Sequence, residues 1–260
     1  MISQENDVLV SIITPTFNSS KYITECIDSV SKQTIQNWEL LITDDCSTDN
    51  TWDIISKYSN QDSRIKVFRL DQNSGAAVAR NKSIENAKGR FIAFLDSDDM
   101  WFPNKLEKQI EFMKEKKCAL SYSSYMTCNN ESETTGIIVC RNYETFSSSK
   151  KNNNIGCLTA VYDTEKVGKV YMPLLRKRQD WGLMLRILEM CDVAYGIKEP
   201  LAIYRHSSNS ISSNKSSLIK YNLLLYQEVL GWSFIHAYIY FIIVFIPNYI
   251  FKKLKIKMYN

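Results

Sequence analysis

The chain has 260 residues, of which 45% are hydrophobic and 23% are charged, so it can bury a substantial core and has an ordinary globular composition. Its net charge of +4 is mild and gives no sign of the concentrated basic face that nucleic-acid-binding proteins present. The 7 cysteines are scattered and contain no Cys-x-x-Cys pair, which predicts reduced thiols in a cytosolic protein and argues against zinc. The polar, acidic first residues do not read as a secretion signal.

Strand and helix signals alternate along the first half of the chain. Short β-branched, apolar runs predict strands at residues 8–14, 38–43, 65–70, 91–95 and 119–125. Helices are predicted after a cap at Ser19 or Ser20, after a cap at residues 49–51, over 76–87 with a stop at Gly89, and over 103–116. This alternation predicts an α/β fold whose mainly parallel sheet is covered on both faces.

Polar residues follow four of the predicted strands, and the last of these four segments contains three carboxylates. The four segments are Thr14-Pro15-Thr16, Asp44-Asp45, Asp71-Gln72-Asn73 and Asp96-Ser97-Asp98-Asp99. Ligands bind beyond the carboxyl ends of parallel strands, so we expect a site at this edge of the sheet. Like charges as close as those in the last segment need a counter-charge, for which Mg²⁺ or Mn²⁺ is the natural candidate. The alternative is an Asp-rich turn that caps a helix beginning at residues 100–103.

The signals change in the second half. A polar loop at 146–154 is followed by a predicted helix at 180–191 and a Ser/Asn-rich stretch at 207–217. Residues 229–251 contain no Asp, Glu, Lys or Arg and are rich in aromatic residues, and four lysines follow before residue 258. This composition predicts a C-terminal helical tail, residues 218–260, that lies in a membrane interface, whereas a helix docked on the domain is the alternative. Residues 1–217 then form the main domain, with parts at 8–125 and 126–217.

Four motifs occur in an order that resembles glycosyltransferase family 2. They are the run at residues 10–18, Asp44-Asp45-Cys46-Ser47-Thr48-Asp49, Asn73-Ser74-Gly75 with Ala79-Arg80-Asn81, and Asp96-Ser97-Asp98-Asp99. The resemblance is dense over residues 8–125 and reaches about residue 205 more loosely. It implies the GT-A fold, a Rossmann-like nucleotide-diphospho-sugar transferase fold, and an inverting enzyme. It also resembles, less specifically, members that extend O-antigen or capsule repeat units on a lipid carrier.

The resemblance implies roles for the residues at the predicted edge. Asp45 would hydrogen-bond the uracil ring, and Thr14 would lie beside the base. Asp96 would contact the ribose and the metal region, Asp98 would bind Mn²⁺ or Mg²⁺ directly, and Asp99 would be a further partner. The metal would neutralise the charge that develops on the departing diphosphate.

Three more residues are expected near the diphosphate. Arg80 lies on the helix after Gly75 and could bind a phosphate, although a solvated helix-face arginine is the alternative. The stretch Tyr204-Arg205-His206 is similar to one found late in many members. It implies a diphosphate contact for Arg205 and a metal contact for His206.

The catalytic base is expected at a helix start in the second half. Arg178-Gln179-Asp180-Trp181 resembles the acidic motif of the family, and the N-terminus of a helix favours an ionised Asp180. Asp180 would take the proton of an acceptor hydroxyl during a single inverting displacement, so an α-linked donor would give a β-linked product. Members often carry two adjacent carboxylates here, whereas this chain has Gln179. The alternative is that Asp180 only caps the helix.

These features predict an enzyme at the cytoplasmic face of the bacterial plasma membrane. It would transfer a hexose, glucose or galactose, from a UDP-sugar to an undecaprenyl-diphosphate-linked sugar, with no nucleic-acid partner. A rhamnosyltransferase that uses dTDP-rhamnose is an alternative, since Asp45 would pair equally well with thymine. A sugar nucleotidyltransferase would present a glycine-rich, basic loop where residues 14–18 lie, and a non-catalytic membrane scaffold would not need the carboxylates.

Overall fold

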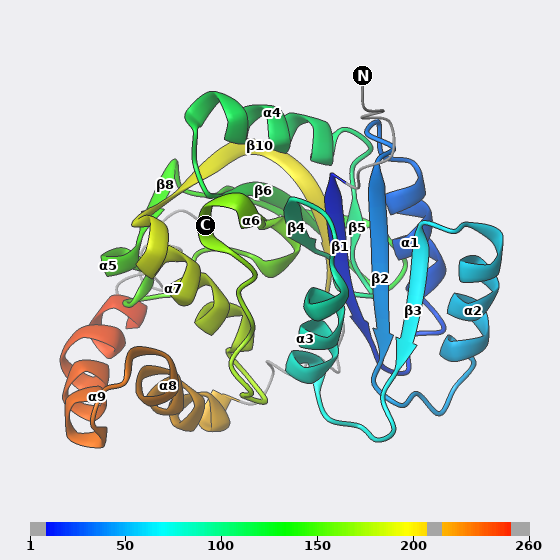
Figure 1. Ribbon diagram of the computed structural model, residues 1–260. Coiled ribbons are helices and arrows are strands. Elements are labelled where there is room, and N and C mark those ends of the chain that lie inside the picture. Colours follow the sequence, from blue (N-terminus) through cyan, green and yellow to red (C-terminus); the bar gives the residue numbers. More distant parts are fainter. Residues whose placement is uncertain (1–8, 207–214, 251–260) are drawn as a thin grey trace.

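In the computed structural model, which describes residues 9–206 and 215–250, ten strands form one sheet with helices on both of its faces (Figure 1). The strands are β1 (Val10–Thr16), β2 (Trp38–Asp44), β3 (Ile65–Arg69), β4 (Phe91–Phe94), β5 (Met100–Trp101), β6 (Leu120–Cys128), β7 (Thr134–Ile138), β8 (Tyr143–Thr145), β9 (Val161–Asp163) and β10 (Val193–Arg205). The helices are α1 (Ile23–Ser31), α2 (Thr51–Gln61), α3 (Ala76–Asn86), α4 (Lys105–Lys116), α5 (Phe146–Ser149), η1 (Cys157–Thr159), α6 (Thr164–Val167), α7 (Gln179–Cys191), α8 (Lys215–Leu230), α9 (Phe234–Tyr240) and the π-helical η3 (Phe241–Phe245).

The sheet runs in the order β3-β2-β1-β4-β9-β6-β10-β5, with β7 beside β6 and β8 beside β10. The first four strands are parallel, and so are β6 and β10. This confirms the α/β fold and the mostly parallel sheet. The short strand β9 joins the two parallel parts, because it pairs antiparallel with both β4 and β6.

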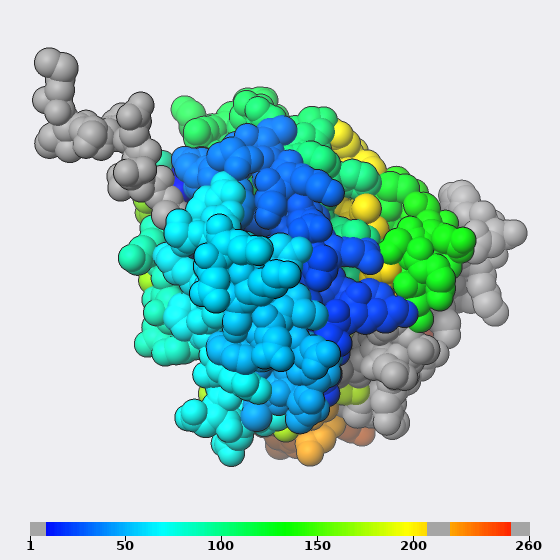
Figure 2. Space-filling view, turned by 90° about the vertical axis from the view of Figure 1, so that its right-hand side faces the viewer, coloured from blue at the N-terminus to red at the C-terminus, as the bar shows by residue number. Residues whose placement is uncertain are grey.

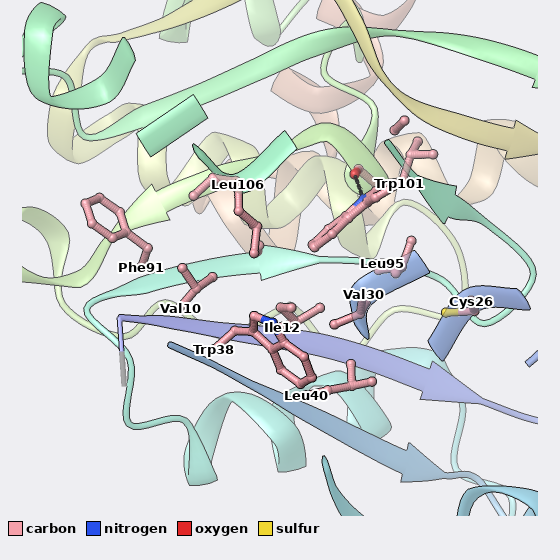
Figure 3. Packing of buried hydrophobic residues seen from close by; sticks show 14 of the residues in the cluster. Val10, Ile12, Cys26, Val30, Trp38, Leu40, Phe91, Leu95, Trp101 and Leu106 are labelled. Atoms are coloured by element: carbon pink, nitrogen blue, oxygen red, sulfur yellow. Dashed lines mark hydrogen bonds between the residues drawn. The ribbon is translucent and has the colours of Figure 1, made fainter. Parts of the chain in front are cut away.

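The two faces of the sheet carry separate cores because successive residues of a strand point to opposite faces. Ile12 and Leu40 belong to a cluster with apolar residues of α1, α2 and α4 (Figure 3). Ile13 and Leu41 belong to the opposite cluster, with residues of α3 and α7. Figure 2 shows the side of the molecule where α1 and α2, in blue and cyan, form the surface. The predicted coverage of both faces is therefore confirmed.

Several predicted boundaries are displaced. Neither Ser19 nor Ser20 caps α1 with its side chain, because the helix begins at Ile23 with Tyr22 as N-cap and no side-chain cap bond. Met100 and Trp101 do not begin a helix, since they form β5 and pair with β10. The stop of α3 comes at Asn86, ahead of Gly89. Gly89 is needed for a different reason: a Cβ there would lie 2.6 Å from the backbone nitrogen of Ser11.

The C-terminal helices pack against α7. Trp181 and Leu185 of α7 form a third cluster with residues of α8, α9 and η3, which lie beside α7 in Figure 1. The predicted boundary at residue 217 falls inside α8, which begins at Lys215. Part of the tail is thus docked on the domain, as the alternative reading expected, while its other side is exposed. No helix within residues 9–206 and 215–250 is both long and apolar enough to span a bilayer.

Candidate active site

The loops that follow β1, β2 and β4 meet at one edge of the sheet. In the parallel register Thr16 lies opposite Asp44, and the backbone N–H of Asp45 donates to the carbonyl of Thr16 at 2.8 Å. On the other side of β1, the N–H of Leu95 donates to the carbonyl of Ile13 at 3.1 Å and leads directly into Asp96. Three of the predicted polar segments therefore share one edge, as expected from the strand order.

Asp45 holds the loop that leads into α3. Its buried carboxylate accepts the backbone N–H groups of Ser74 at 2.7 Å and of Gly75 at 2.8 Å. Gly75 has a φ of +94°, which L side chains rarely adopt, so glycine is required here by conformation. Thr14 is fully buried in β1, and its hydroxyl has no hydrogen-bond partner among the described residues. The predicted contacts of Asp45 and Thr14 with a nucleotide base remain predictions.

The acidic segment after β4 places three carboxylates in different surroundings. Asp99 is 1% exposed; its Oδ1 accepts the backbone N–H of Arg205 at 2.9 Å, and its Oδ2 has no partner in the described part of the chain. Burial and the neighbouring Asp96 raise the pKa of Asp98 to about 6. Burial, Asp98 and Asp96 also raise the pKa of Asp99. The cluster is therefore short of positive charge.

Arg80 supplies part of the missing charge. Its guanidinium is ion-paired with the carboxylate of Asp96 and contacts the sulfur of Met172 at 3.9 Å. The side chain is buried, so the alternative of a solvated helix-face arginine is wrong. Burial disfavours its charge, but Asp96 and other negative groups outweigh burial and raise its pKa. A direct contact of Arg80 with phosphate remains a prediction.

Arg205 lies where the motif predicts, but its guanidinium is buried and bonded to the protein. It donates to Glu25 at 2.7 Å, to the hydroxyl of Ser132 at 2.9 Å and to the carbonyl of Asp98 at 3.0 Å. These bonds join the end of β10 to α1 and to the acidic segment. The geometry therefore gives Arg205 a structural role and does not support the expected diphosphate contact.

His206 is exposed at the end of β10. Its ring packs edge-on against Tyr204, with centroids 5.1 Å apart, and its backbone N–H donates to the carbonyl of Cys128 at 2.8 Å. Within the described ranges, no three His, Cys, Asp or Glu side chains are grouped so that they could hold a metal ion. The structure therefore does not bring His206 into a ligand set with Asp96 and Asp98.

Asp180 reaches the same region from the second half of the chain. It is the second residue of α7, and its Oδ2 accepts a hydrogen bond from the side-chain amide of Asn153 at 3.0 Å. Arg80 and the buried thiol of Cys157 each interact electrostatically with both Asp96 and Asp180. The acidic segment and the predicted base thus converge on Arg80, although they lie far apart in the sequence.

Two contacts of this site were missed from the sequence. Asn153 lies in the polar loop 146–154, where nothing in the local pattern distinguishes it from Asn152 and Asn154. The hydroxyls of Ser19 and Ser97 are 2.8 Å apart and tie the loop after β1 to the acidic segment. Neither contact leaves a periodic or motif signal.

The carboxylates fit a divalent, oxygen-preferring cation. Asp98 and Asp99 have raised pKa values, and a buried oxygen of Asp99 has no partner among the described residues. A cation would relieve both conditions. Mg²⁺ commonly uses one or two carboxylates and completes its coordination with substrate phosphates, so a third protein ligand is not needed.

Comparisons with known proteins agree on one family. The family model for glycosyl transferase family 2 matches residues 11–163. The chain is 46% identical over 230 residues to the "Putative teichuronic acid biosynthesis glycosyltransferase TuaG" of Bacillus subtilis, covering 88% of this chain and 91% of that protein. It is 43% identical over 216 residues to the "UDP-Glc:alpha-D-GlcNAc-diphosphoundecaprenol beta-1,3-glucosyltransferase WfgD" of Escherichia coli, covering 83% and 84% of the two chains.

A solved structure shows the same fold. The S. aureus TarS 1–349 structure in complex with UDP-GlcNAc superposes with a TM-score of 0.70 at 24% identity, covering 88% of this chain and 69% of that one. This likeness supports the GT-A fold. The match of the family model over residues 11–163 and the similarity to TuaG and WfgD show that the chain belongs to glycosyl transferase family 2 and is a glycosyltransferase.

Proposed function

We propose that this enzyme transfers a hexose, glucose or galactose, from a UDP-sugar to a sugar on undecaprenyl diphosphate. The transfer inverts the anomeric centre and forms a β-glycosidic bond in an O-antigen or capsule repeat unit. The observation that carries the proposal is the convergence of the acidic segment and Asp180 on the buried Arg80. The relative WfgD, whose name gives UDP-Glc as donor and a diphosphoundecaprenol acceptor, supports this choice of substrates.

We assign the donor side of the site to the carboxyl edge of the sheet. Asp45 and Thr14 lie where the uracil would bind, and Asp96 with Asp98 would hold Mn²⁺ or Mg²⁺. When bound, the cation stabilises negative charge on the departing diphosphate. Arg80 fixes the orientation of Asp96 through their ion pair and adds a positive charge at the same place.

We assign the acceptor side to Asp180. Its carboxylate takes the proton of the acceptor hydroxyl while that oxygen forms a bond to the anomeric carbon. The bond from the anomeric carbon to the diphosphate oxygen breaks in the same step, and its electron pair leaves with UDP. A positioned general base of this kind contributes about 10²- to 10⁴-fold to the rate.

The test is a donor screen on the purified full-length chain. The protein is incubated with Mn²⁺, a panel of UDP- and dTDP-sugars and a synthetic GlcNAc-diphosphate-lipid, and products are followed by mass spectrometry. Transfer from UDP-glucose or UDP-galactose is expected, with loss of activity in EDTA and in the Asp98→Asn and Asp180→Asn variants. Asp53→Asn, which changes an exposed carboxylate on α2, serves as the matched control and should retain activity. Transfer from dTDP-rhamnose alone would overturn the donor assignment and leave the mechanism in place.

We also propose that the C-terminal helices lie on the cytoplasmic face of the plasma membrane, where a lipid-linked acceptor is found. Nine large apolar side chains of this region are exposed. They are Phe234, Ile235, Tyr238, Ile239, Ile242, Ile243, Ile246, Tyr249 and Ile250. The sequence continues with Lys252, Lys253, Lys255 and Lys257, whose charges suit anionic lipid. Aromatic and apolar side chains next to lysines are typical of helices that lie in the membrane interface.

A further inference from the structure

The predicted base has a hydrogen-bond partner that lies outside the motifs quoted above. The side-chain amide of Asn153 donates to Oδ2 of Asp180 at 3.0 Å, across 27 residues of sequence. The neighbour of Asp180 in the chain, Gln179, does not take this place; its Oε1 is buried and has no partner among the described residues. The contact to Asp180 therefore comes from a separate loop.

The loop that carries Asn153 is anchored independently of Asp180. Its next residue, Asn154, donates to the fully buried carboxylate of Glu144. At its start, the indole N–H of Trp181 donates to the carbonyl of Ser149 at 2.8 Å, and the hydroxyl of Tyr226 donates to the carbonyl of Lys150 at 2.9 Å. These bonds fix the position of Asn153 relative to the start of α7.

Asn153 also has a feature that a purely structural role leaves unexplained. Its Oδ1 is buried and accepts no hydrogen bond in the described part of the chain. A buried polar atom without a partner costs free energy, so the amide reduces stability at that atom. Of the two ends of the amide, only the N–H₂ group has a partner among the described residues, and that partner is Asp180.

We propose that Asn153 is a positioning residue for the base. Its hydrogen bond fixes Oδ2 of Asp180 and so sets the direction of Oδ1, the oxygen that takes the acceptor proton. Arg80, Arg178 and the thiol of Cys157 interact electrostatically with Asp180, and the hydrogen bond to its Oδ2 comes from the amide of Asn153. This inference rests on the proposed function of Asp180.

The first test is a double-mutant cycle in the full-length enzyme, with the transfer assay described above. Asn153→Ala should lower kcat about 10- to 100-fold, because a misplaced catalytic group costs about that much, while the Kd for the UDP-sugar stays within about twofold. In the Asp180→Ala background the same change should lower kcat by less than about twofold, because Asn153 acts through Asp180. An equal loss in both backgrounds would overturn the proposal.

Two further measurements separate positioning from structure. The thermal midpoint of Asn153→Ala should match or exceed that of wild type, since the variant also removes the unpartnered amide oxygen. Asn153→Asp should shift the acid limb of the kcat/KM profile to higher pH, because a second carboxylate next to Asp180 raises the pKa of the pair. A lower midpoint with an unshifted profile would show that Asn153 is structural.

The matched control is Asn152→Ala. Its amide donates to the side chain of Asn154 at 3.2 Å and not to Asp180, so kcat should change by less than about threefold. If wild type transfers no sugar from any donor, the proposed function fails. If wild type is active and Asn153→Ala equals it, this inference alone fails.

Discussion

At the scale of single residues, the surroundings of Asp98 make the stability of the metal-free protein depend on pH. Burial and Asp96 raise its pKa from 3.8 to about 6, so the folded state keeps a proton that the unfolded chain has already lost. The free energy of unfolding therefore falls as pH rises from about 4 to about 6. Asn cannot titrate, so the Asp98→Asn variant should gain stability relative to wild type over this window, by up to about 3 kcal/mol.

Urea unfolding in EDTA at pH 4.5 and pH 7 measures this difference. The variant should be the more stable protein at pH 7, and Mn²⁺ should narrow the gap because it stabilises only wild type. If the difference in unfolding free energy between variant and wild type is the same at both pH values, Asp98 does not hold a proton at pH 4.5 in the folded protein and its pKa is not raised.

Residue identity and residue role are not equally predictable from the sequence. Asp45, Asp96 and Asp98 were expected at strand ends, and the structure brings the ends of those strands to one edge of the sheet. Asp180 was identified from its resemblance to the acidic motif of the family, and in the structure it interacts electrostatically with Arg80. The surroundings of Arg205 were not predictable, since its partner Glu25 lies 180 residues away. A sequence motif identifies the position of a residue in the chain, but contacts between distant segments decide what its side chain binds.

At the scale of elements, α7 contains a glycine that stabilises the packing of the helix, although glycine has a low helix propensity. A Cβ at Gly182 would collide with the ring of Pro173 and lie 3.1 Å from Leu225 of α8. Gly182→Ala should therefore lower the free energy of unfolding by about 1–3 kcal/mol through overpacking, despite the roughly 1 kcal/mol that Ala gains in a helix. Glu189→Ala, on the exposed side of α7, should change stability by less than about 0.5 kcal/mol. A stabilised Gly182→Ala variant would mean that α8 does not pack this closely.

The hydrogen bond between α8 and the loop before Asn153 gives a second prediction. Tyr226 is fully buried, and its hydroxyl donates to the carbonyl of Lys150 at 2.9 Å. Tyr226→Phe should lower the free energy of unfolding by about 1 kcal/mol, and kcat should fall because the loop is held less firmly. Tyr221→Phe on the same helix is the control, and equal effects in the two variants would contradict the role of this bond.

The elements of the first half were largely predictable from the sequence, whereas the strands β5, β7, β8, β9 and β10 were not predicted. Helix caps and helical periodicity placed α1 to α4, and short β-branched, apolar runs placed β1 to β4, to within a few residues. The three-residue strand β9, which joins the two parallel parts of the sheet, was not predicted. A strand this short carries too few residues to show a period, and its pairing depends on β4 and β6 already being in place.

At the scale of the whole molecule, the C-terminal helices have two different sides. One side packs on Trp181 and Leu185, next to the predicted base, and the other exposes apolar residues of α9 and η3. Membrane contact on the outer side would therefore place Asp180 at a fixed height above the lipid surface. Under the proposed function, this distance from the lipid would keep Asp180 within reach of an acceptor sugar on a membrane-bound diphosphate.

The exposed side can be tested by vesicle co-sedimentation of the full-length chain. Each of Ile239 and Ile243 would bury a side chain worth about 1.5–3 kcal/mol in lipid, so the Ile239→Glu/Ile243→Glu variant should bind vesicles containing phosphatidylglycerol at least about 100-fold more weakly. Ile137→Glu/Ile138→Glu is the matched control, because these isoleucines are also exposed but lie on β7. If both variants bind like wild type, the C-terminal helices do not contact lipid. If only the first is weakened, and its transfer to a short water-soluble acceptor is unchanged, the helices serve to bring the enzyme to its lipid-linked substrate.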